Sequence, residues 1–336
     1  MTALVQTETI TKELLLERAK NLQPILQERV RESESNRVLS KKTITDFQDA
    51  GFFKILQPKK FGGYEMDPRW FFDVVIEIAA VCPSSAWVLG VIGVHNWQLA
   101  LFPKETQQEV WGTDNNILVS SSYMPAGKVE RVDGGYKFSG KWGFSSGSDH
   151  CDWVFLGGFV PPNKTQKHPE MRTFLLPKSD FSLVDDWFTS GLKGTGSKSV
   201  LVEDVFVPEN RTHKMSDGFR RKSPGHAIND NWIYKIPFGQ IFTRSVATPA
   251  IGMAKGALEA YKEVTSKKVG RADGAKVALD PQSQEVCAQA ALAIDEAHSL
   301  LHRDYESLKN HAIEDTEIPI EERVRFRYNS SVTTEK

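Results

Sequence analysis

The spacing of apolar residues changes twice along this chain of 336 residues, and the order of these changes restricts the folds that it can adopt. From about residue 9 to residue 112, apolar side chains recur three and four positions apart, which is typical of amphipathic helices. From about residue 117 to residue 208 they alternate with polar ones, which predicts strands. From about residue 236 the helical spacing returns. We therefore expect an N-terminal helical domain (1–115), a central β domain (116–212) and a C-terminal helical domain (213–336).

The central region carries a hairpin signal. Two alternating segments, 128–132 and 136–140, flank Asp133-Gly134-Gly135, and an Asp-Gly pair favours the tight turn that joins antiparallel strands. Short strands are expected at 153–159, 173–176 and 200–207. Regularly spaced short strands with Gly, Pro and Asp between them predict an antiparallel barrel or sandwich.

Helix starts can be read from the flanking regions. Asp67-Pro68 and Pro83-Ser84-Ser85 each precede an apolar segment, which predicts helices from 68 and from about 83 to 102. Residues 215–231 are expected to form a polar loop. The chain ends at Lys336 without a helix-ending signal, so we expect the C-terminal bundle to be incomplete. Its helices are expected around 251–261, across 284–308 and from 321.

Composition argues against several classes of function. The formal net charge is -1, which gives no electrostatic footprint for nucleic acid or an anionic membrane. The three cysteines, Cys82, Cys151 and Cys287, form no CxxC pair, so neither a metal site nor a disulfide framework is predicted, and a cytoplasmic protein is expected. The most apolar segment, 87–102, is too short to span a membrane. The sequence contains neither a GxGxxG motif nor a P-loop.

The segment Lys141-Trp142-Gly143-Phe144-Ser145-Ser146-Gly147 combines aromatic rings, hydroxyls and glycines at the end of a predicted strand. Aromatic side chains can wall a site for a flat ring system, and hydroxyls with glycine-exposed backbone N–H groups can hydrogen-bond to its edge. An isoalloxazine ring is such a ligand. An ordinary turn rich in serine and glycine is the alternative.

Further motifs, taken in their order, resemble those of one family. They are Phe61-Gly62-Gly63-Tyr64, Cys82-Pro83-Ser84-Ser85-Ala86-Trp87, Gly93-Val94-His95, Ser120-Ser121-Ser122-Tyr123-Met124-Pro125, Gly191-Leu192-Lys193-Gly194-Thr195-Gly196-Ser197 and Val205-Phe206-Val207-Pro208. Together with residues 140–147, they make nearly the whole chain similar to the acyl-CoA dehydrogenase fold. Within that fold the chain resembles group D flavin-dependent monooxygenases, the oxygenase components of two-component aromatic hydroxylases. Hydroxyphenylacetate 3-hydroxylases and the steroid-catabolic 3-hydroxy-9,10-seconandrostatriene-dione hydroxylase belong to this group.

The resemblance implies an α+β multidomain fold with an N-terminal helical domain, a central antiparallel β-barrel or sandwich and a C-terminal four-helix bundle. Chains of this family continue beyond the point that matches Lys336. The resemblance therefore implies that the last bundle helices, a Gly-Gly flavin contact and a second catalytic histidine lie outside this sequence. A homotetramer, built as a dimer of dimers, is also implied.

The activity implied is hydroxylation of a small phenolic substrate with O2 through a flavin C4a-hydroperoxide. Reduced FMN or FAD would be the co-substrate, delivered by diffusion from a separate NAD(P)H-dependent flavin reductase.

The same resemblance implies roles for individual side chains. His95 is expected to act on the substrate phenol, because an imidazole can accept a proton near neutral pH, and Ser146 is expected to be the second catalytic group. Arg271 is expected to bind flavin phosphate through its guanidinium fork. The other flavin contacts expected are Trp87, Ser121, Ser122, Tyr123, Trp142, Phe144, Ser145 and Ser146. The substrate contacts expected are His95, Ser121, Phe238 and Phe242.

Alternatives stay open at each level. The aromatic residues and His95 can equally be core residues, and Lys267 or Lys268 can take the place of Arg271. For the whole chain, an acyl-CoA dehydrogenase-type FAD oxidoreductase is one alternative. Residues 120–127 and 142–147 depart from the Thr-Glu-Pro…Gly-Ser-Asp and Trp-Ile-Thr-Asn-Gly-like segments of those enzymes. A catalytically inert assembly partner is the other.

Overall fold

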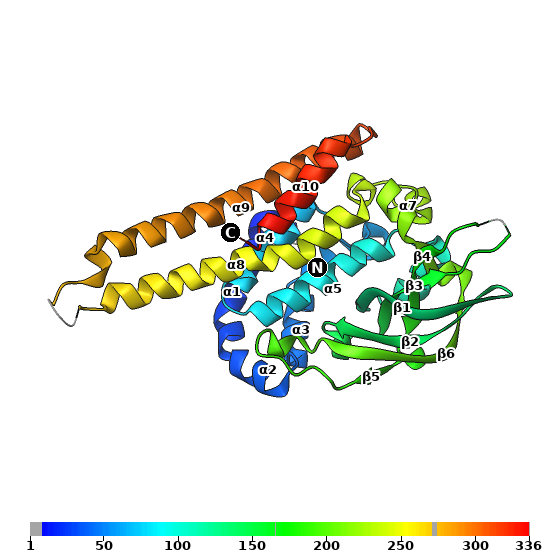
Figure 1. Cartoon of the computed structure of the whole chain (residues 1–336), viewed down its shortest axis with the longest axis horizontal. Helices are drawn as coiled ribbons and strands as arrows, with labels where there is room; N and C mark the ends of the chain where they lie inside the picture. The colour runs from blue at the N-terminus through cyan, green and yellow to red at the C-terminus, as the bar shows by residue number, and fades with distance from the viewer. Residues whose placement is uncertain (1–8, 165, 271–273, 336) are drawn as a thin grey trace, which may run out of the picture.

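The computed structural model describes residues 9–164, 166–270 and 274–335. Figure 1 shows a β sheet at one end of the molecule and two long helices, α8 and α9, that lie side by side and project away from it. The helices that precede the sheet are α1 (Lys12–Glu28), α2 (Val30–Asn36), α3 (Lys41–Asp49), α4 (Pro68–Ala79), α5 (Pro83–Leu99) and α6 (Lys104–Trp111). Those that follow it are α7 (Met215–Arg220), α8 (Phe238–Lys267), α9 (Pro281–Ile313) and α10 (Ile320–Val332).

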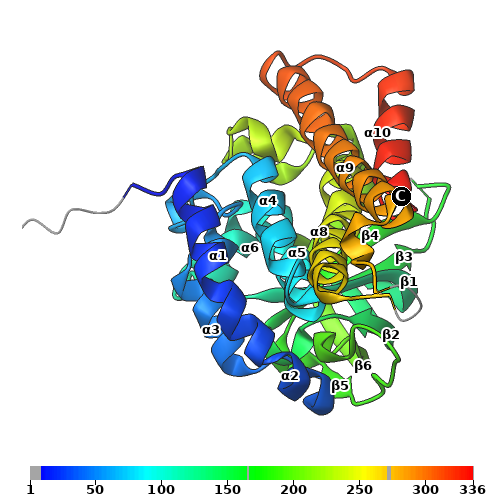
Figure 2. The ribbon, with the colours of Figure 1, turned by 90° about the vertical axis from the view of Figure 1, so that its left-hand side faces the viewer.

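Helix α5 is surrounded by the rest of the protein. All its residues except Pro83 and Trp87 are buried, which is the pattern of a helix that is covered on every side. It packs against α4, α8 and the first strand, and Figure 2 shows it between the N-terminal helices and α8. The polar side chains of α5 must therefore find their partners inside the protein.

Helix α4 begins where the sequence predicts. The carboxylate of Asp67 accepts a hydrogen bond from the backbone N–H of Arg69 at 3.0 Å, and Pro68 occupies the first turn. Helix α8 lies directly on α4, because a Cβ atom at Gly252 would come within 2.3 Å of the carbonyl oxygen of Ile76. The close approach of these two helices brings the C-terminal region against the N-terminal one.

The sheet contains β1 (Val119–Val132), β2 (Gly135–Ser145), β3 (Trp153–Val160), β4 (Glu170–Pro177), β5 (Ser182–Val184), β6 (Lys198–Pro208) and β7 (Thr212–Lys214). Their order is β5-β6-β2-β1-β3-β4-β7. The predicted hairpin is confirmed, since β1 and β2 are antiparallel with Val132 opposite Gly135. The domain limits at 115/116 and 212/213 stay predictions.

The sheet is mixed, where a wholly antiparallel arrangement was predicted. β1 pairs in parallel with β3, with Val119 opposite Trp153 and Ser122 opposite Leu156. Strand β2 ends beside the start of β1, and a short crossover containing a turn at Ser148–His150 carries the chain past β1 to β3. Because β2 is antiparallel to β1, a β3 that starts at the end where β2 stops must run parallel to β1. The crossover begins at Ser146.

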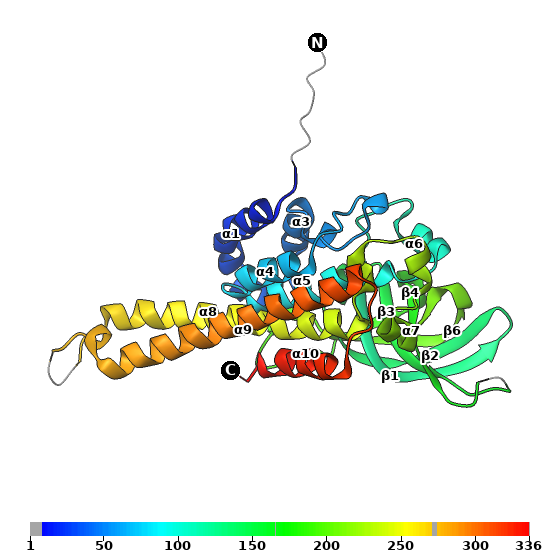
Figure 3. The ribbon, with the colours of Figure 1, turned by 90° about the horizontal axis from the view of Figure 1, so that it is seen from above.

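Three long helices form the C-terminal part. A buried ion pair between Arg244 of α8 and Asp304 of α9 measures 2.7 Å, and the amide of Asn329 in α10 donates to the same carboxylate at 3.0 Å. Figure 3 shows α10 on the side of α8 and α9 that faces away from α1. Residues 215–231 are not a plain loop as predicted, because they contain α7.

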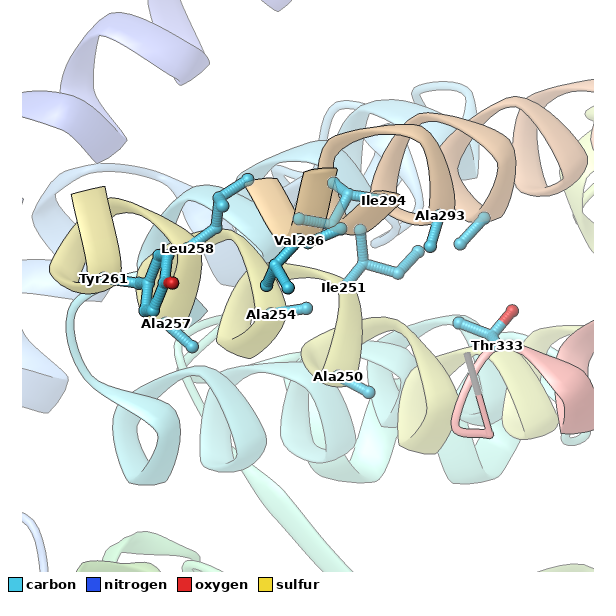
Figure 4. A pocket seen from close by; sticks show the side chains of 12 residues that line it. Ala250, Ile251, Ala254, Ala257, Leu258, Tyr261, Val286, Ala293, Ile294 and Thr333 are labelled. Atoms are coloured by element: carbon cyan, nitrogen blue, oxygen red, sulfur yellow. The ribbon is translucent and has the colours of Figure 1, made fainter. Parts of the chain in front are cut away.

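An apolar groove of about 380 Å³ runs between α8 and α9. Figure 4 shows Ile251, Ala254 and Leu258 of α8 facing Val286 and Ile294 of α9 across it. Among the described residues, no helix is long and apolar enough to cross a membrane.

Candidate active site

A second cavity, of about 230 Å³, lies where α5, β1, the end of β2 and α8 meet. It brings together side chains that are far apart in the sequence, and polar groups gather here rather than in the apolar groove between α8 and α9. Seven of the predicted site residues line it: Trp87, Ser121, Ser122, Tyr123, Phe144, Ser146 and Phe242. Val91, Met124, Gly143 and Val246 complete the lining.

Ser146 belongs to a chain of hydrogen bonds that leads away from the cavity. The indole N–H of Trp87 donates to Ser146 Oγ at 3.1 Å, and Ser146 Oγ lies 2.7 Å from Ser197 Oγ. Ser197 Oγ lies 2.7 Å from Thr195 Oγ1, which donates to the carbonyl oxygen of Leu192 at 2.9 Å.

The carbonyl at the far end fixes the direction of this chain. A carbonyl oxygen can only accept, so the single hydroxyl hydrogen of Thr195 is used on Leu192. Ser197 must then donate to Thr195, and Ser146 must donate to Ser197. The Ser146 oxygen already accepts from Trp87, which leaves one lone pair. Toward a ligand, Ser146 is therefore a hydrogen-bond acceptor.

Phe144 stands at the cavity in a strained backbone conformation. The pairing of β2 with β6 is irregular between Trp142 and Ser145, and within this irregularity Phe144 has φ 63°. This left-handed conformation is uncommon for a bulky residue and often marks a functional site. The side chain of Phe144 is 72% exposed. Ser122 donates to the carbonyl oxygen of Gly143 at 2.7 Å, which ties β1 to this bulge.

His95 lies one layer of side chains away from the cavity. Its Nδ1 is 2.6 Å from the carbonyl oxygen of Val119, so Nδ1 carries the hydrogen and donates it. Nε2 then carries a lone pair, and it is buried without a hydrogen-bond partner among the described residues. Burial lowers the pKa of His95 to about 4, so the imidazole is neutral near pH 7. Its ring makes an edge-to-face contact with Tyr123 at 6.2 Å.

Tyr123 joins the cavity to an aromatic cluster. Its hydroxyl donates to Gln98 Oε1, and burial raises the pKa of Tyr123 far above its usual value. The ring packs edge to face against Phe242 at 4.9 Å and against Phe238 at 5.5 Å. Phe242 lines the cavity, whereas Phe238 is stacked behind it at 5.6 Å.

Besides His95, three other predicted site residues do not line the cavity. Trp142 is fully buried in the β core, where its ring lies 4.8 Å from Phe138 and its N–H donates to the carbonyl oxygen of Gly157 at 2.9 Å. Ser145 is buried, and its hydroxyl has no partner among the described residues. Phe238 is the third. Arg271, the predicted phosphate ligand, lies outside the described residues.

Gln98, Thr195 and Ser197 are functional residues for which the sequence predicts no role. Gln98 follows His95 by three positions on α5, a spacing that places both on one face of a helix, and this was the available signal. Thr195 and Ser197 belong to the motif at residues 191–197, but their role depends on Ser146, which is distant in the sequence.

The residues present suit a flat ring with hydrogen-bond donors at its edge. Trp87 and Phe144 supply ring faces, Ser146 supplies an acceptor, and Phe242 with Tyr123 supplies an aromatic end. A reduced isoalloxazine ring meets these requirements.

Two parts of the chain match known domain families. Residues 13–114 match the acyl-CoA dehydrogenase, N-terminal domain, and residues 245–336 match the acyl-CoA dehydrogenase, C-terminal domain. These segments contain α5 and the part of α8 from residue 245 onward, and both helices contribute to the cavity lining.

Two relatives that cover most of the chain are named as an oxygenase subunit and an oxygenase component. The chain is 40% identical over 313 residues to the flavin-dependent monooxygenase, oxygenase subunit HsaA, of Rhodococcus jostii (strain RHA1). The aligned region covers 93% of this chain and 81% of the relative. It is 30% identical over 312 residues to the p-hydroxyphenylacetate 3-hydroxylase, oxygenase component, of Acinetobacter baumannii, over 92% of this chain and 73% of the relative. The crystal structure of 3-HSA hydroxylase from Rhodococcus sp. RHA1 is similar with a TM-score of 0.90 and 39% identity, and covers 96% of this chain and 82% of that one. The chain therefore belongs to the family of flavin-dependent monooxygenase oxygenase components that share the acyl-CoA dehydrogenase fold.

Proposed function

We propose that this protein is the oxygenase component of a two-component aromatic hydroxylase. It takes reduced flavin, FMN or FAD, from a separate reductase and hydroxylates a small phenolic substrate with O2. The observation that carries the proposal is the single cavity in which Trp87, Tyr123, Phe144 and Ser146 meet beside a buried, neutral His95. The names of its relatives, an oxygenase subunit and an oxygenase component, support the division of labour with a reductase.

Reduced flavin, when bound, supplies the electrons that activate O2. Its N5 atom carries a hydrogen and donates, whereas N5 of the oxidised ring accepts. Ser146 offers an acceptor, because its own hydrogen is used on Ser197. With N5 placed against Ser146, the hydrogen-bond chain favours the reduced ring over the oxidised one. This preference suits a protein that receives flavin already reduced.

The side chains around Ser146 keep water from the reacting atoms. Trp87, Val91 and Val246 line the cavity with apolar surface, whereas Phe144 stands at its exposed edge. A dry site strengthens the remaining hydrogen bonds and limits side reactions with water. The Ser122 hydroxyl does not donate to a ligand, because its hydrogen is donated to the carbonyl oxygen of Gly143.

His95 offers a hydrogen-bond acceptor for the phenol from behind the side chains that line the cavity. Its Nδ1–H is held by Val119, so Nε2 presents a lone pair, and the neutral form dominates at pH 7. When the side chain of Tyr123 turns aside, a phenol can reach this nitrogen and donate a hydrogen bond from its O–H, which raises the electron density of the aromatic ring. The orphaned Nε2 then gains the partner that it lacks.

The aromatic end of the cavity defines the substrate class. Tyr123 and Phe242 present ring surfaces, and their positions are held by Phe238 and Gln98. Flat aromatic substrates fit such walls through offset and edge-to-face contacts. None of the residues that line the cavity carries a charge, which suits a neutral phenol.

Assembly into a tetramer is part of the proposal. Apolar side chains are exposed on the projecting pair of helices, among them Tyr261, Val264, Val286 and Leu292. Exposed apolar surface of this kind is typical of an interface between copies. Light scattering at micromolar concentration should give a mass near four chains, and a monomer would contradict this part.

Anaerobic binding followed by exposure to O2 tests the proposed activity. The protein should bind reduced FMN or FAD more tightly than the oxidised forms, and addition of O2 with a panel of phenols should yield hydroxylated product. The alternatives give different results. A dehydrogenase would hold FAD tightly and show bleaching of that FAD by an acyl-CoA. An inert assembly partner would bind neither redox form.

A further inference from the structure

Three metal-ligating side chains meet away from the cavity, where α9 lies against α4. His298 and His302 project from α9, and Asp73 projects from α4. Nε2 of His298 lies 2.9 Å from Asp73 Oδ1, and Nε2 of His302 lies 2.8 Å from the same oxygen. The three potential ligand atoms all lie within 4.8 Å of one another. The proposed hydroxylase activity uses none of them.

The helical spacing makes the two imidazoles converge. His298 and His302 are four positions apart, so both rings stand on one face of α9, and their centroids are 4.4 Å apart. The carboxylate of Asp73 is buried, with Oδ1 toward the two imidazoles and Oδ2 toward the ammonium group of Lys12. One carboxylate oxygen therefore faces two imidazole nitrogens.

Two imidazole nitrogens and one carboxylate oxygen are a donor set that binds Zn²⁺ in proteins. Zn²⁺ bonds to these atoms are about 2.0–2.2 Å long, so tetrahedral ligand atoms lie roughly 3.3 Å apart. The observed separations of 2.9 Å and 2.8 Å need to widen only slightly to admit the ion. The histidine side chains are 42% and 28% exposed, so an ion can enter from solvent and water can complete its coordination.

We propose that Asp73, His298 and His302 bind a divalent transition-metal cation, Zn²⁺ by the nature of the donors, and that this ion links α9 to α4. Without the ion, Nε2–H of each imidazole donates to Asp73 Oδ1. On binding, each Nε2 releases that hydrogen to water and turns its lone pair toward the ion, and the neutral ring carries its hydrogen on Nδ1. The site differs from the cavity in location and in chemistry, so it goes beyond the proposed function. It would tie the base of the projecting helix pair to the N-terminal domain.

Lys12 modulates this site. Its Nζ lies 2.9 Å from Asp73 Oδ2, the carboxylate oxygen that does not face the histidines. This leaves Oδ1 for the ion, but the ammonium charge opposes a second cation nearby. Replacement of Lys12 by methionine should therefore tighten Zn²⁺ binding several-fold, whereas an ordinary surface histidine that binds Zn²⁺ would show no such response.

Calorimetric titration of EDTA-treated full-length protein with ZnCl2 tests the proposal. We expect one Zn²⁺ per chain, a higher melting temperature on binding, and visible absorption of a four-coordinate ion when Co²⁺ replaces Zn²⁺. His298→Ala and His302→Ala should each weaken binding at least about tenfold. His311→Ala is the matched control, because His311 lies on the same helix and contacts Glu322 and not Asp73. It should bind Zn²⁺ like the unmodified chain.

The histidine variants decide the outcome, because both side chains are partly exposed and their loss leaves the fold intact, as circular dichroism can verify. Asp73→Asn adds a third variant, to be judged only if it folds, since Asp73 is buried. The absence of Zn²⁺ uptake by the unmodified chain would overturn the proposal. Equal uptake by the unmodified chain and the His298→Ala, His302→Ala double variant would overturn it as well.

Discussion

The hydroxyl oxygens of Ser146 and Ser197 lie 2.7 Å apart, and this contact determines where the Ser146 hydrogen points. Ser197 is itself bonded to Thr195, whose hydrogen is used on a backbone carbonyl. The direction of these hydrogen bonds is thus set at the carbonyl oxygen of Leu192, three hydrogen bonds away from Ser146. Ser146 is left as an acceptor, which is the property that distinguishes reduced from oxidised flavin in our proposal.

Ser197→Ala should reduce the preference for reduced flavin. Without its acceptor, the Ser146 hydroxyl can rotate and donate to N5 of the oxidised ring. A neutral hydrogen bond contributes about 0.5–1.5 kcal/mol, so the ratio of the two dissociation constants should change by roughly two- to tenfold. Anaerobic and aerobic titrations measure both constants. Ser145→Ala is the control, because the Ser145 hydroxyl is buried away from the cavity, and an unchanged ratio in Ser197→Ala would refute the directional chain.

His95→Asn should leave the binding of reduced flavin nearly unchanged and should lower hydroxylation by roughly 10²–10⁴-fold, the range of a general acid–base group. Hydrogen peroxide release should rise in its place, because the oxygen is consumed without transfer to the ring. Chromatography of product and a peroxide assay give the coupling ratio. His213→Asn provides a comparison, since His213 is also buried but packs on Phe102 outside the cavity. If His95→Asn keeps the wild-type ratio of hydroxylated product to hydrogen peroxide, His95 is a core residue without a role in hydroxylation.

Protein stability should fall as the pH is lowered from about 6.5 toward 4. Burial lowers the pKa of His95 from 6.5 to about 4, so in this window the unfolded chain binds a proton that the folded chain does not. The loss is on the order of 3 kcal/mol for this residue and is complete below the folded pKa. His213 adds to it, because burial and the charge of His226 lower its pKa to about 3. Urea unfolding at several pH values should show a smaller fall for His95→Asn, and an equal fall would contradict the assignment.

Trp142→Phe should destabilise the protein without weakening flavin binding. The change removes the hydrogen bond to the buried carbonyl oxygen of Gly157 and leaves a gap beside Phe138, at a cost of about 1–3 kcal/mol. Trp87→Phe is the paired test, because Trp87 lines the cavity and donates to Ser146. If Trp142→Phe lowers flavin affinity as much as Trp87→Phe does, Trp142 is a flavin contact after all.

Phe144→Gly should keep or increase stability while it weakens flavin binding about three- to tenfold, the value of one aromatic contact. Glycine adopts the φ of 63° without strain, and an exposed phenylalanine contributes little to the core. Phe144→Ala separates the two effects, since it loses the ring but keeps the strain. Thermal unfolding and flavin titration measure them, and unchanged affinity in both variants would remove Phe144 from the site.

Helices were the most predictable part of the fold. Helix α4 starts at the predicted Asp67-Pro68 signal, and α5 extends over most of its predicted range. These features depend on neighbours in the sequence. The parallel pairing of β1 with β3 does not, because it follows from the crossover between β2 and β3. The short strands β5 and β7, of three residues each, are too brief to show a period.

Site residues that lie together in one segment could be predicted from the sequence. Those whose role depends on contacts between distant segments could not. The motif residues of β1 and the end of β2 do line one cavity. The role of Ser197 depends on a contact across 51 positions, and the meeting of Asp73 with His302 spans 229. Trp142 was predicted to contact the flavin because it is aromatic. The alternation of side chains along β2 instead points it toward the buried core of the β domain.

Single-turnover hydroxylation measures whether the protein transfers oxygen to a phenol when it holds reduced flavin. The protein is loaded anaerobically with one equivalent of reduced FMN or FAD, mixed with O2 and a phenol, and assayed for hydroxylated product and hydrogen peroxide. We expect most of the oxidised flavin to yield hydroxylated phenol, and His95→Asn to divert this oxygen to hydrogen peroxide. Flavin oxidation that gives only peroxide with every phenol, at the same rate with and without the protein, would contradict it.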